Sequence, residues 1–221
     1  MKIADFTEER KLIKRGVRSI AGLDEVGRGP LAGPVVACAL VFDFKHKNFA
    51  DFSAQIQWRD SKLHTPKRRV EILARLRDFT GVSFAVAIVA PRQIDQLNIL
   101  VASWLAMRRA VEKLKNQPEF LLIDGRYTLE NYPCNQKALV RGDQSVASIA
   151  AASIVAKVLR DQMMEKYHRR WPQYGFDRHK GYGTRQHLLA IKKYGPCPIH
   201  RLSFAPFRHN LKSPRYSKRI T

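Results

Sequence analysis

Two apolar segments, separated by a pair of acids and a glycine-rich loop, follow one another in the stretch Ile20-Ala21-Gly22-Leu23-Asp24-Glu25-Val26-Gly27-Arg28-Gly29-Pro30-Leu31-Ala32-Gly33-Pro34-Val35-Val36. The first segment predicts a short buried strand over residues 19–24, and the second predicts a longer apolar strand over residues 34–43. Because the link between them is short, we expect the two strands to be antiparallel neighbours. The stretch therefore places Asp24 and Glu25 at the end of a buried strand.

Outward from this stretch, helical and extended patterns alternate along the chain. Strands are also predicted over residues 82–90, 120–124 and 136–141. Helices are predicted over residues 66–79, 98–115, 145–171 and 184–194, with proline and glycine as start and stop signals. This order predicts an α/β fold in which helices flank a mixed β-sheet and a helical region follows at the C-terminal end.

Acidic residues occur where strands end. Asp24 and Glu25 follow the run Ile20-Ala21-Gly22-Leu23, Asp124 follows the run Phe120-Leu121-Leu122-Ile123, and Asp143 precedes a predicted helix. For any one of them alone, a role as a turn or cap residue is the better interpretation, because Asp is common there. The set is different: unpaired buried carboxylates cost several kcal/mol, roughly, and this chain has twice as many bases as acids.

The set of acids is typical of a metal site. Clusters that offer only oxygen ligands suit hard cations such as Mg²⁺ or Mn²⁺. Zinc is disfavoured because neither His nor Cys lies nearby in the sequence. Adjacent strand residues point to opposite faces, so Asp24 and Glu25 both reach the metals only if the strand ends there or if one of them binds less directly.

Asp143 and Asp161 are both candidates for the last acid of the set. They lie 18 positions apart, and most of that interval is predicted to be helical, which separates them by about 27 Å. They therefore cannot share one metal cluster. Asp143 lies beside the predicted helix start, directly after the last strand, and is the expected member; Asp161 is expected to form a structural ion pair beside Arg160.

The net charge of +21 over 221 residues is concentrated toward the C-terminal end. Residues 141–221 hold 17 basic and 4 acidic side chains, and 11 Lys or Arg follow Asp177, the last acid. Such an excess predicts a polyanionic partner, with nucleic acid ahead of an anionic membrane surface. The longest apolar run has eight residues, against about 20 for a bilayer span. The three cysteines are odd in number and far apart, so a reducing, cytoplasmic setting is expected. A secretion signal is not expected, because the first 20 residues contain no continuous apolar stretch.

Two other motif interpretations fail on spacing. The loop after the first strand is not a dinucleotide fingerprint, because Gly33 comes one place too late and Pro30 disrupts the expected helix start. The run Lys180-Gly181-Tyr182-Gly183 matches the first half of an RNA-recognition-motif signature, but Thr184-Arg185-Gln186-His187 lacks the apolar and aromatic second half. A stacking Tyr182 in a basic loop remains a reasonable interpretation.

The stretch 20–36 resembles the signature of bacterial ribonuclease HII. Further agreement is found in Asp60-Ser61-Lys62, Leu122-Ile123-Asp124-Gly125, Gly142-Asp143 with residues 148–161, His179-Lys180-Gly181-Tyr182-Gly183-Thr184, and Gly195-Pro196-Cys197-Pro198-Ile199-His200-Arg201. Fewer than 20 residues precede the first predicted strand, which favours the HII type over HIII with its extra N-terminal domain. The resemblance implies an RNase H-like catalytic domain over residues 19–207, a charged extension over residues 1–18 and a basic tail over residues 208–221.

The resemblance also implies an activity and its residues. The expected enzyme is a monomeric endonuclease that cuts the RNA strand of RNA/DNA hybrids, including single ribonucleotides in duplex DNA, and leaves 3′-hydroxyl and 5′-phosphate ends. Divalent Mn²⁺ or Mg²⁺ would be held by Asp24, Glu25, Asp124 and Asp143, and two such ions about 4 Å apart suit an in-line displacement. The residues expected to contact substrate are Gly27, Arg28, Gly29, Lys62, Lys157, Lys180, Tyr182 and Arg185.

Two other functions compete with this interpretation. A non-catalytic basic protein that binds nucleic acid would account for the charge but not for acids at strand ends, and a metal-dependent nuclease assay separates it. A DNA nuclease or transposase-like enzyme on the same fold would cut all-DNA duplex, so comparing that substrate with ribonucleotide-containing duplex separates it.

Overall fold

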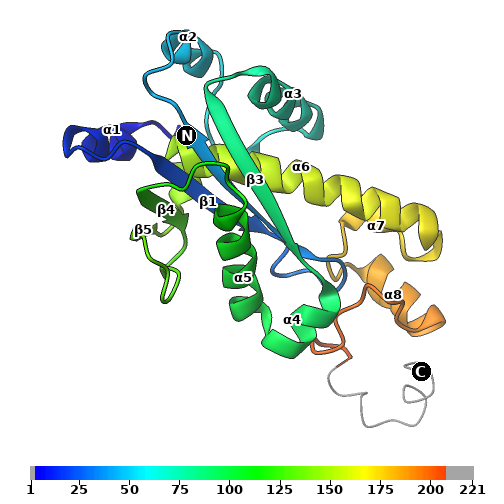
Figure 1. Cartoon of the computed structure of the whole chain (residues 1–221). Helices are drawn as coiled ribbons and strands as arrows, with labels where there is room; N and C mark the ends of the chain where they lie inside the picture. Colours follow the sequence, from blue (N-terminus) through cyan, green and yellow to red (C-terminus); the bar gives the residue numbers. More distant parts are fainter. Residues whose placement is uncertain (1–2, 208–221) are drawn as a thin grey trace. The chain divides into compact units, whose positions relative to one another are not determined.

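A five-stranded sheet in the order β3-β2-β1-β4-β5 is the central element of the computed structural model, which describes residues 3–207 (Figure 1). The strands are β1 (Ile20–Val26), β2 (Val35–Phe42), β3 (Val82–Val89), β4 (Phe120–Asp124) and β5 (Asn135–Leu139). β1 pairs with β2 in antiparallel fashion, as predicted, and with β4 in parallel; β4 pairs in parallel with β5. The C-terminal ends of β1, β4 and β5 therefore lie at one edge of the sheet.

Eight α-helices and three single 3₁₀ turns occur among the described residues. The helices are α1 (Thr7–Lys14), α2 (Phe49–Ala54), α3 (Pro66–Asp78), α4 (Pro91–Leu97), α5 (Ile99–Glu112), α6 (Ala147–Arg170), α7 (Phe176–His179) and α8 (Arg185–Tyr194). The 3₁₀ turns are η1 (Ser61–Leu63), η2 (Gly142–Gln144) and η3 (Pro172–Tyr174). Within residues 3–207, none of the helices has the length and apolar character needed to cross a membrane.

Residue contacts group the described chain into two units. The first contains residues 3–26, 36–88 and 104–159, and so includes the sheet; the second contains residues 27–35, 89–103 and 160–207. The predicted boundaries after residues 18 and 207 stay predictions, and the predicted basic tail, residues 208–221, lies outside the described residues.

Close contact between β1 and α6 organises the first unit. A Cβ atom at Gly22 would lie 2.5 Å from the amide nitrogen of Ile149 and 2.6 Å from the carbonyl oxygen of Ser148, so only glycine allows the helix to approach this strand. The buried Glu9 of α1 accepts a hydrogen bond from the Ser148 N–H at 3.0 Å and thereby caps the start of α6. Leu12 of α1 also packs in an apolar cluster with Ile20 of β1 and Ile149 of α6.

Several predicted elements need correction. β1 extends to Val26, so Glu25 lies inside the strand rather than after it. The helix predicted over residues 98–115 is α5, which begins at Ile99 and ends at Glu112; α4 precedes it, and the two are separated at Asn98, whose φ is 68°. The Asn98 side chain accepts the N–H groups of Leu100 and Val101 at 2.9 and 3.2 Å, which caps α5. The sequence pattern also missed α2, α4 and α7.

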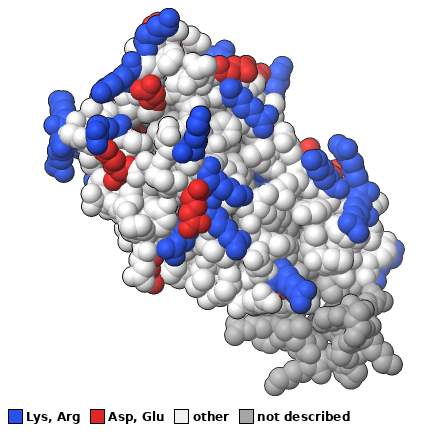
Figure 2. Space-filling view, in the orientation of Figure 1, with Lys and Arg blue, Asp and Glu red and all other residues white. Residues whose placement is uncertain are grey.

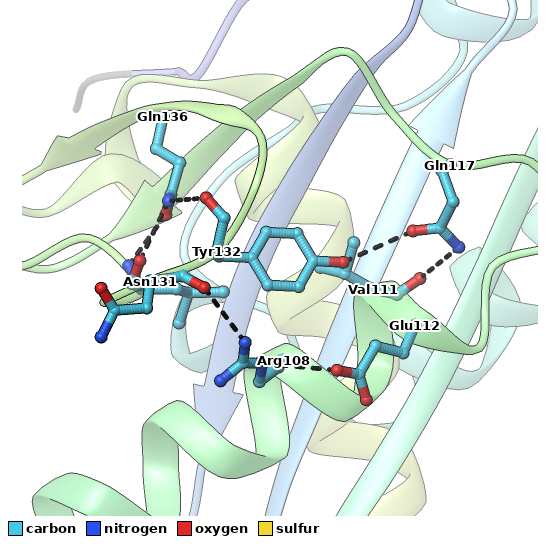
Figure 3. A network of polar contacts seen from close by, with 8 residues as sticks. Arg108, Val111, Glu112, Gln117, Asn131, Tyr132 and Gln136 are labelled. Atoms are coloured by element: carbon cyan, nitrogen blue, oxygen red, sulfur yellow. Dashed lines mark hydrogen bonds and ion pairs between the residues drawn. The ribbon is translucent and has the colours of Figure 1, made fainter.

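A polar network supports the connection between the parallel strands β4 and β5 (Figure 3). Gln136 exchanges two hydrogen bonds with the Leu129 backbone, at 2.8 and 3.0 Å. The Tyr132 hydroxyl donates to Gln117 at 3.4 Å, and Arg108 donates to the Asn131 carbonyl at 3.2 Å. Side chains therefore hold this connection, which contains no helix.

Candidate functional site

The C-terminal ends of β1 and β4 place Asp24 and Asp124 on neighbouring strands. Leu23 pairs with Ile123 in the parallel register, and Asp24 and Asp124 are the residues that directly follow this pair on the two strands. Asp24 is buried, whereas Glu25 and Asp124 are half-buried. The Glu25 N–H donates to the Asp24 carboxylate at 2.7 Å. The parallel pairing therefore brings together two acids that lie 100 residues apart in the sequence.

Asp143 joins this edge of the sheet from η2, the 3₁₀ turn after β5. The Gly142 N–H donates to the Asp124 carboxylate at 2.7 Å, and the Asp143 N–H donates to the same group. Asp143 itself is buried, and its charge acts on Asp24. Asp161 lies elsewhere, in the part of α6 that belongs to the second unit.

A fifth acid, Asp60, was missed by sequence reasoning. Its side chain hydrogen-bonds that of Asp143, and its Oδ1 atom accepts the Lys62 N–H at 3.0 Å, so it caps the η1 turn. The signal was present, because Asp60 opens the Asp60-Ser61-Lys62 segment that agrees with the resembled family. An N-capping role for Asp is common enough to have hidden it.

Burial and mutual repulsion raise the pKa values of three of these carboxyl groups. Burial raises the pKa of Asp24 well above its ordinary value, and the charges of Glu25 and Asp124 raise it further. For Asp143, burial and then the charges of Asp124 and Asp60 raise the pKa to about 6. Burial also raises the pKa of Asp124, although the two backbone N–H groups oppose it. We call the end of the sheet that holds Asp24, Asp124 and Asp143 the acidic edge. Its raised pKa values show that the surrounding described residues do not fully balance the negative charge of these carboxylates.

Two buried serines support Asp24. The Ser153 side chain on α6 hydrogen-bonds the Asp24 carboxylate and lies 3.0 Å from the Ser61 hydroxyl oxygen. This pair of hydroxyl groups fixes the rotamer of Asp24 from the side of the helix.

Residues 3–207 contain no group of three or more His, Cys, Asp or Glu side chains already gathered as ligands for a metal ion. The carboxylates are close enough to shift one another's pKa values, but they are not a preformed ligand set. Their fit to a cation therefore rests on electrostatics and on the chemistry of the donors, which are all carboxylate oxygens.

Two predicted phosphate contacts, Lys62 and Lys157, belong to the same unit as the acids. Lys62 is exposed on η1, and its charge lowers the pKa values of Asp124 and Asp143. Lys157 is half-buried on α6. Lys62 thus acts electrostatically on Asp124 and Asp143.

The other predicted substrate contacts belong to the second unit. Gly27 has a φ of 102° and is buried, while Arg28 and Gly29 are exposed. A side chain at residue 27 would be strained by this φ and would collide with Arg160. A methyl group on Gly29 would lie 3.6 Å from the Cε1 atom of Tyr182, so the exposed Tyr182 ring lies beside Gly29.

Histidines hold the backbone of the Tyr182 loop. The Gly181 N–H donates to His179 Nδ1 at 3.2 Å, and the Tyr182 carbonyl lies 2.9 Å from His187 Nδ1. His187 Nε2 lies 3.0 Å from His200 Nε2. Burial lowers the pKa of His187 to about 4 and that of His200 to about 3, so both rings are neutral at pH 7.

Lys180 and Arg185 flank this loop in different states. The Lys180 ammonium pairs with Glu165 at 2.8 Å, so this carboxylate competes with a phosphate for its charge. Arg185 is exposed in the first turn of α8. Figure 2 shows Lys and Arg spread widely over the drawn face, with fewer Asp and Glu between them.

Comparisons with known proteins give one family. The family model for ribonuclease HII matches residues 21–207. Ribonuclease HII from Chlamydia caviae is 48% identical over 200 residues, 90% of each chain, and that from Endomicrobium trichonymphae is 47% identical over 201 residues, 91% of this chain and 92% of its own. The crystal structure of ribonuclease H2 from Pyrococcus horikoshii matches with a TM-score of 0.71 and 26% identity over 86% of this chain and 96% of that one.

The predicted fold is thereby confirmed: a mixed sheet flanked by helices, with helices at the C-terminal end, as in ribonucleases H. The predicted enzyme class is confirmed as well, since the family model and the curated relatives agree. The chain belongs to the ribonuclease HII family and is an RNase H, a hydrolase that cuts the RNA of RNA/DNA hybrids.

Proposed function

We propose that this ribonuclease HII also cuts at single ribonucleotides embedded in duplex DNA, and that it leaves 3′-hydroxyl and 5′-phosphate ends. The hydrolysis depends on divalent cations, Mn²⁺ or Mg²⁺, held by Asp24, Asp124 and Asp143, while Glu25, which follows Asp24 inside β1, binds less directly. The solved Bst-RNase HIII, which shares the fold at a TM-score of 0.60 and 20% identity, is described in complex with Mn²⁺.

The observation that carries the proposal is the unbalanced negative charge at the acidic edge. Burial and mutual repulsion raise the pKa values of Asp24, Asp124 and Asp143, so a cation there would be attracted by all three. Carboxylate oxygens are the ligands that Mg²⁺ and Mn²⁺ prefer. When bound, a pair of such cations lowers the pKa of an attacking water and stabilises charge on the leaving oxygen.

The protein's own groups orient the carboxylates for this role. Ser153 and the Glu25 N–H fix Asp24, and the Gly142 N–H fixes Asp124. Asp60 contacts Asp143 and limits its freedom. Because these contacts already exist in the fold, little reorganisation is needed when substrate binds.

Recognition of the ribonucleotide is assigned to the second unit. Arg28 and Gly29 are exposed, and Gly29 carries no side chain, which lets this backbone approach a 2′-hydroxyl, the group that distinguishes RNA from DNA. The exposed Tyr182 ring beside Gly29 offers an apolar face for a sugar. Lys62, Lys157, Lys180 and Arg185 supply phosphate contacts, which give affinity and little sequence preference.

A comparison of three duplexes tests the proposal. Duplexes of one sequence contain no ribonucleotide, one ribonucleotide, or a full RNA strand, and each is incubated with Mn²⁺, with Mg²⁺ or with a chelator. We expect cleavage of the second and third duplexes only, with a metal ion only, and 5′-phosphate ends on the products. Cleavage of all-DNA duplex, or cleavage in chelator, would overturn the proposal.

A further inference from the structure

Two arginines in the second unit, Arg160 and Arg201, are fully buried. Arg201 points all three of its donor nitrogens at the glycine loop, which we define as residues 27–34. Its Nε, Nη1 and Nη2 atoms donate to the carbonyl oxygens of Gly33, Arg28 and Gly27, at 2.9, 2.9 and 2.6 Å. One side chain thus ties the first residues of the loop to one of its last.

Arg160 connects the same loop to the Tyr182 loop. Its Nε and Nη2 atoms donate to the carbonyl oxygens of Pro34 and Ala32 at 3.0 and 3.1 Å. Its Nη1 atom donates to the carbonyl of Lys180, two residues before Tyr182, at 3.0 Å. A single guanidinium group therefore bonds both segments that are proposed to read the ribonucleotide.

Burying these two arginines costs free energy of folding, which argues against the view that their side chains only fill space. Burial and then the charge of Arg160 lower the pKa of Arg201 to about 9, and burial lowers the pKa of Arg160 as well. Two like charges are thus buried close together, and all six hydrogen bonds described above go to neutral carbonyls. Two apolar side chains would fill the space without this cost, so the directed bonds are the feature to explain.

We propose that Arg160 and Arg201 are positioning residues for ribonucleotide recognition: their guanidinium groups fix the glycine loop and align it with Tyr182. The inference rests on the proposed role of Gly27-Arg28-Gly29 and Tyr182 in reading the substrate. A planar guanidinium offers donors in a rigid fork, which a lysine ammonium on a flexible stem cannot reproduce. Reading one hydroxyl group with backbone atoms needs placement within about 0.5 Å, and such placement requires a rigid support.

The position of the cut measures this alignment directly. The substrate is a DNA duplex with four consecutive ribonucleotides in one strand, cut in Mn²⁺ and mapped at single-nucleotide resolution. We expect the wild-type protein to cut mainly at one position relative to the RNA–DNA junction. In Arg201→Lys the ratio of that cut to all others falls at least threefold. The ratio is independent of the folded fraction, because only folded molecules cut.

Arg160→Lys is the second variant, and we expect the same threefold fall; it also covers the case in which Arg201→Lys leaves too little folded protein. Arg69→Lys is the matched control. Arg69 is a buried arginine of the first unit that donates to the carbonyls of Ser61 and His64 at 2.9 and 2.6 Å. Its replacement is expected to lower the melting temperature while the cut ratio stays within the wild-type range.

The outcomes separate the two proposals. If both lysine variants cut less but keep the wild-type ratio, the arginines only stabilise the fold and the inference is wrong. If Tyr182→Ala spreads the cuts and the lysine variants do not, the substrate-reading proposal stands without the arginines. If the wild-type protein cuts all positions equally, the proposed reading of the junction fails, and the positioning role fails with it.

Discussion

Both units of the molecule bury like charges, but they balance them differently. In the second unit, Arg160 and Arg201 direct six hydrogen bonds at backbone carbonyls, and the charges of Asp161 and Asp95 act favourably on Arg160 and Arg201, respectively. In the first unit, Asp24 accepts the Glu25 N–H and a bond from Ser153, and its pKa still lies well above the ordinary value. The arginines are satisfied within the fold, whereas the carboxylates are not.

This difference indicates how buried charges that stabilise the fold can be distinguished from buried charges that bind a ligand. A buried charge whose donors or acceptors are all used serves the fold, and its removal leaves orphaned partners. A buried charge that stays unbalanced costs stability and is retained for what it can bind. Substitutions in the two units should therefore act in opposite directions on stability.

The largest effect is expected from Asp24→Asn. Loss of a carboxylate from the acidic edge should lower kcat by about 10³-fold, or about 4 kcal/mol in the barrier, while affinity for hybrid duplex is kept because phosphate contacts supply it. The melting temperature in chelator should rise, because repulsion with Glu25 and Asp124 is removed. Steady-state kinetics and thermal melts measure both. Asp161→Asn is the control and should keep its kcat; retention of a tenth of the wild-type rate in Asp24→Asn would contradict the assignment.

Arg201→Met should act in the opposite direction on stability. It leaves the carbonyls of Gly27, Arg28 and Gly33 without their donor, and unsatisfied buried groups of this kind cost about 1–3 kcal/mol each before relaxation. We expect the free energy of unfolding to fall by about 3 kcal/mol, which lowers the melting temperature by about 6–12 °C. An unchanged or raised melting temperature would mean that the buried arginines, like the carboxylates, do not stabilise the fold, and the contrast between the two units would be wrong.

Lowering the pH should reduce the repulsion among the carboxylates of the first unit and destabilise the second unit, where two histidines are buried in the neutral form. The folded pKa values of His187 and His200 are about 4 and about 3, against an ordinary 6.5, so between pH 6.5 and 4 the unfolded chain binds protons that the fold does not. Stability from these rings is therefore complete above pH 6.5 and is lost as the pH falls. His179, which stacks on His187 at 4.4 Å, has a lowered pKa too.

Denaturant titrations at pH 7 and pH 5 measure this effect. The raised pKa values of the carboxyl groups work in the other direction, so the double variant His187→Gln/His200→Gln isolates the histidines. We expect the wild-type protein to lose about 4 kcal/mol more than the double variant between the two pH values, which is about 2 kcal/mol for each of the two histidines. Equal losses would mean that the two rings do not need to stay neutral.

The smallest effect is expected from Tyr182→Ala, which removes a surface contact and disturbs neither charge cluster. Activity on a duplex with one ribonucleotide should fall about 10-fold, in line with the roughly 1–3 kcal/mol that an aromatic contact to a nucleotide contributes. Affinity for all-DNA duplex should stay near the wild-type value, as measured by fluorescence anisotropy. Equal losses on both duplexes would show that Tyr182 packs against the fold and does not read the ribonucleotide.

Much of the sheet and of the acidic edge could be predicted from the sequence. The apolar runs before Asp24 and Asp124 predict two strands that end in acids, and the parallel pairing puts these ends together. The start of α5 was predicted to within one residue, but α4, which ends just before Asn98, was not predicted. Asp60 was missed because N-capping explains it equally well.

The supports of the site could not be predicted. Arg160 and Arg201 occur in a chain with 40 basic residues, where any arginine is expected at the surface. Their burial depends on carbonyls more than 100 positions away in the chain. Ser153 likewise gains its role only when α6 meets β1. Local patterns hold no information on such contacts.

The histidine pair has a direction, and a backbone amide sets it. The Cys197 N–H donates to His200 Nδ1 at 2.9 Å, a shorter contact than the 3.3 Å between Nδ1 and the Cys197 carbonyl, which favours the tautomer of neutral His200 with its proton on Nε2. That proton is donated to His187 Nε2, which leaves the His187 proton on Nδ1 for the Tyr182 carbonyl. Cys197 stands between Pro196 and Pro198, and of the three only Cys197 has an N–H group. A substitution that keeps an N–H group at residue 197 therefore keeps this donor, whereas Cys197→Pro would remove the contact that sets the two tautomers.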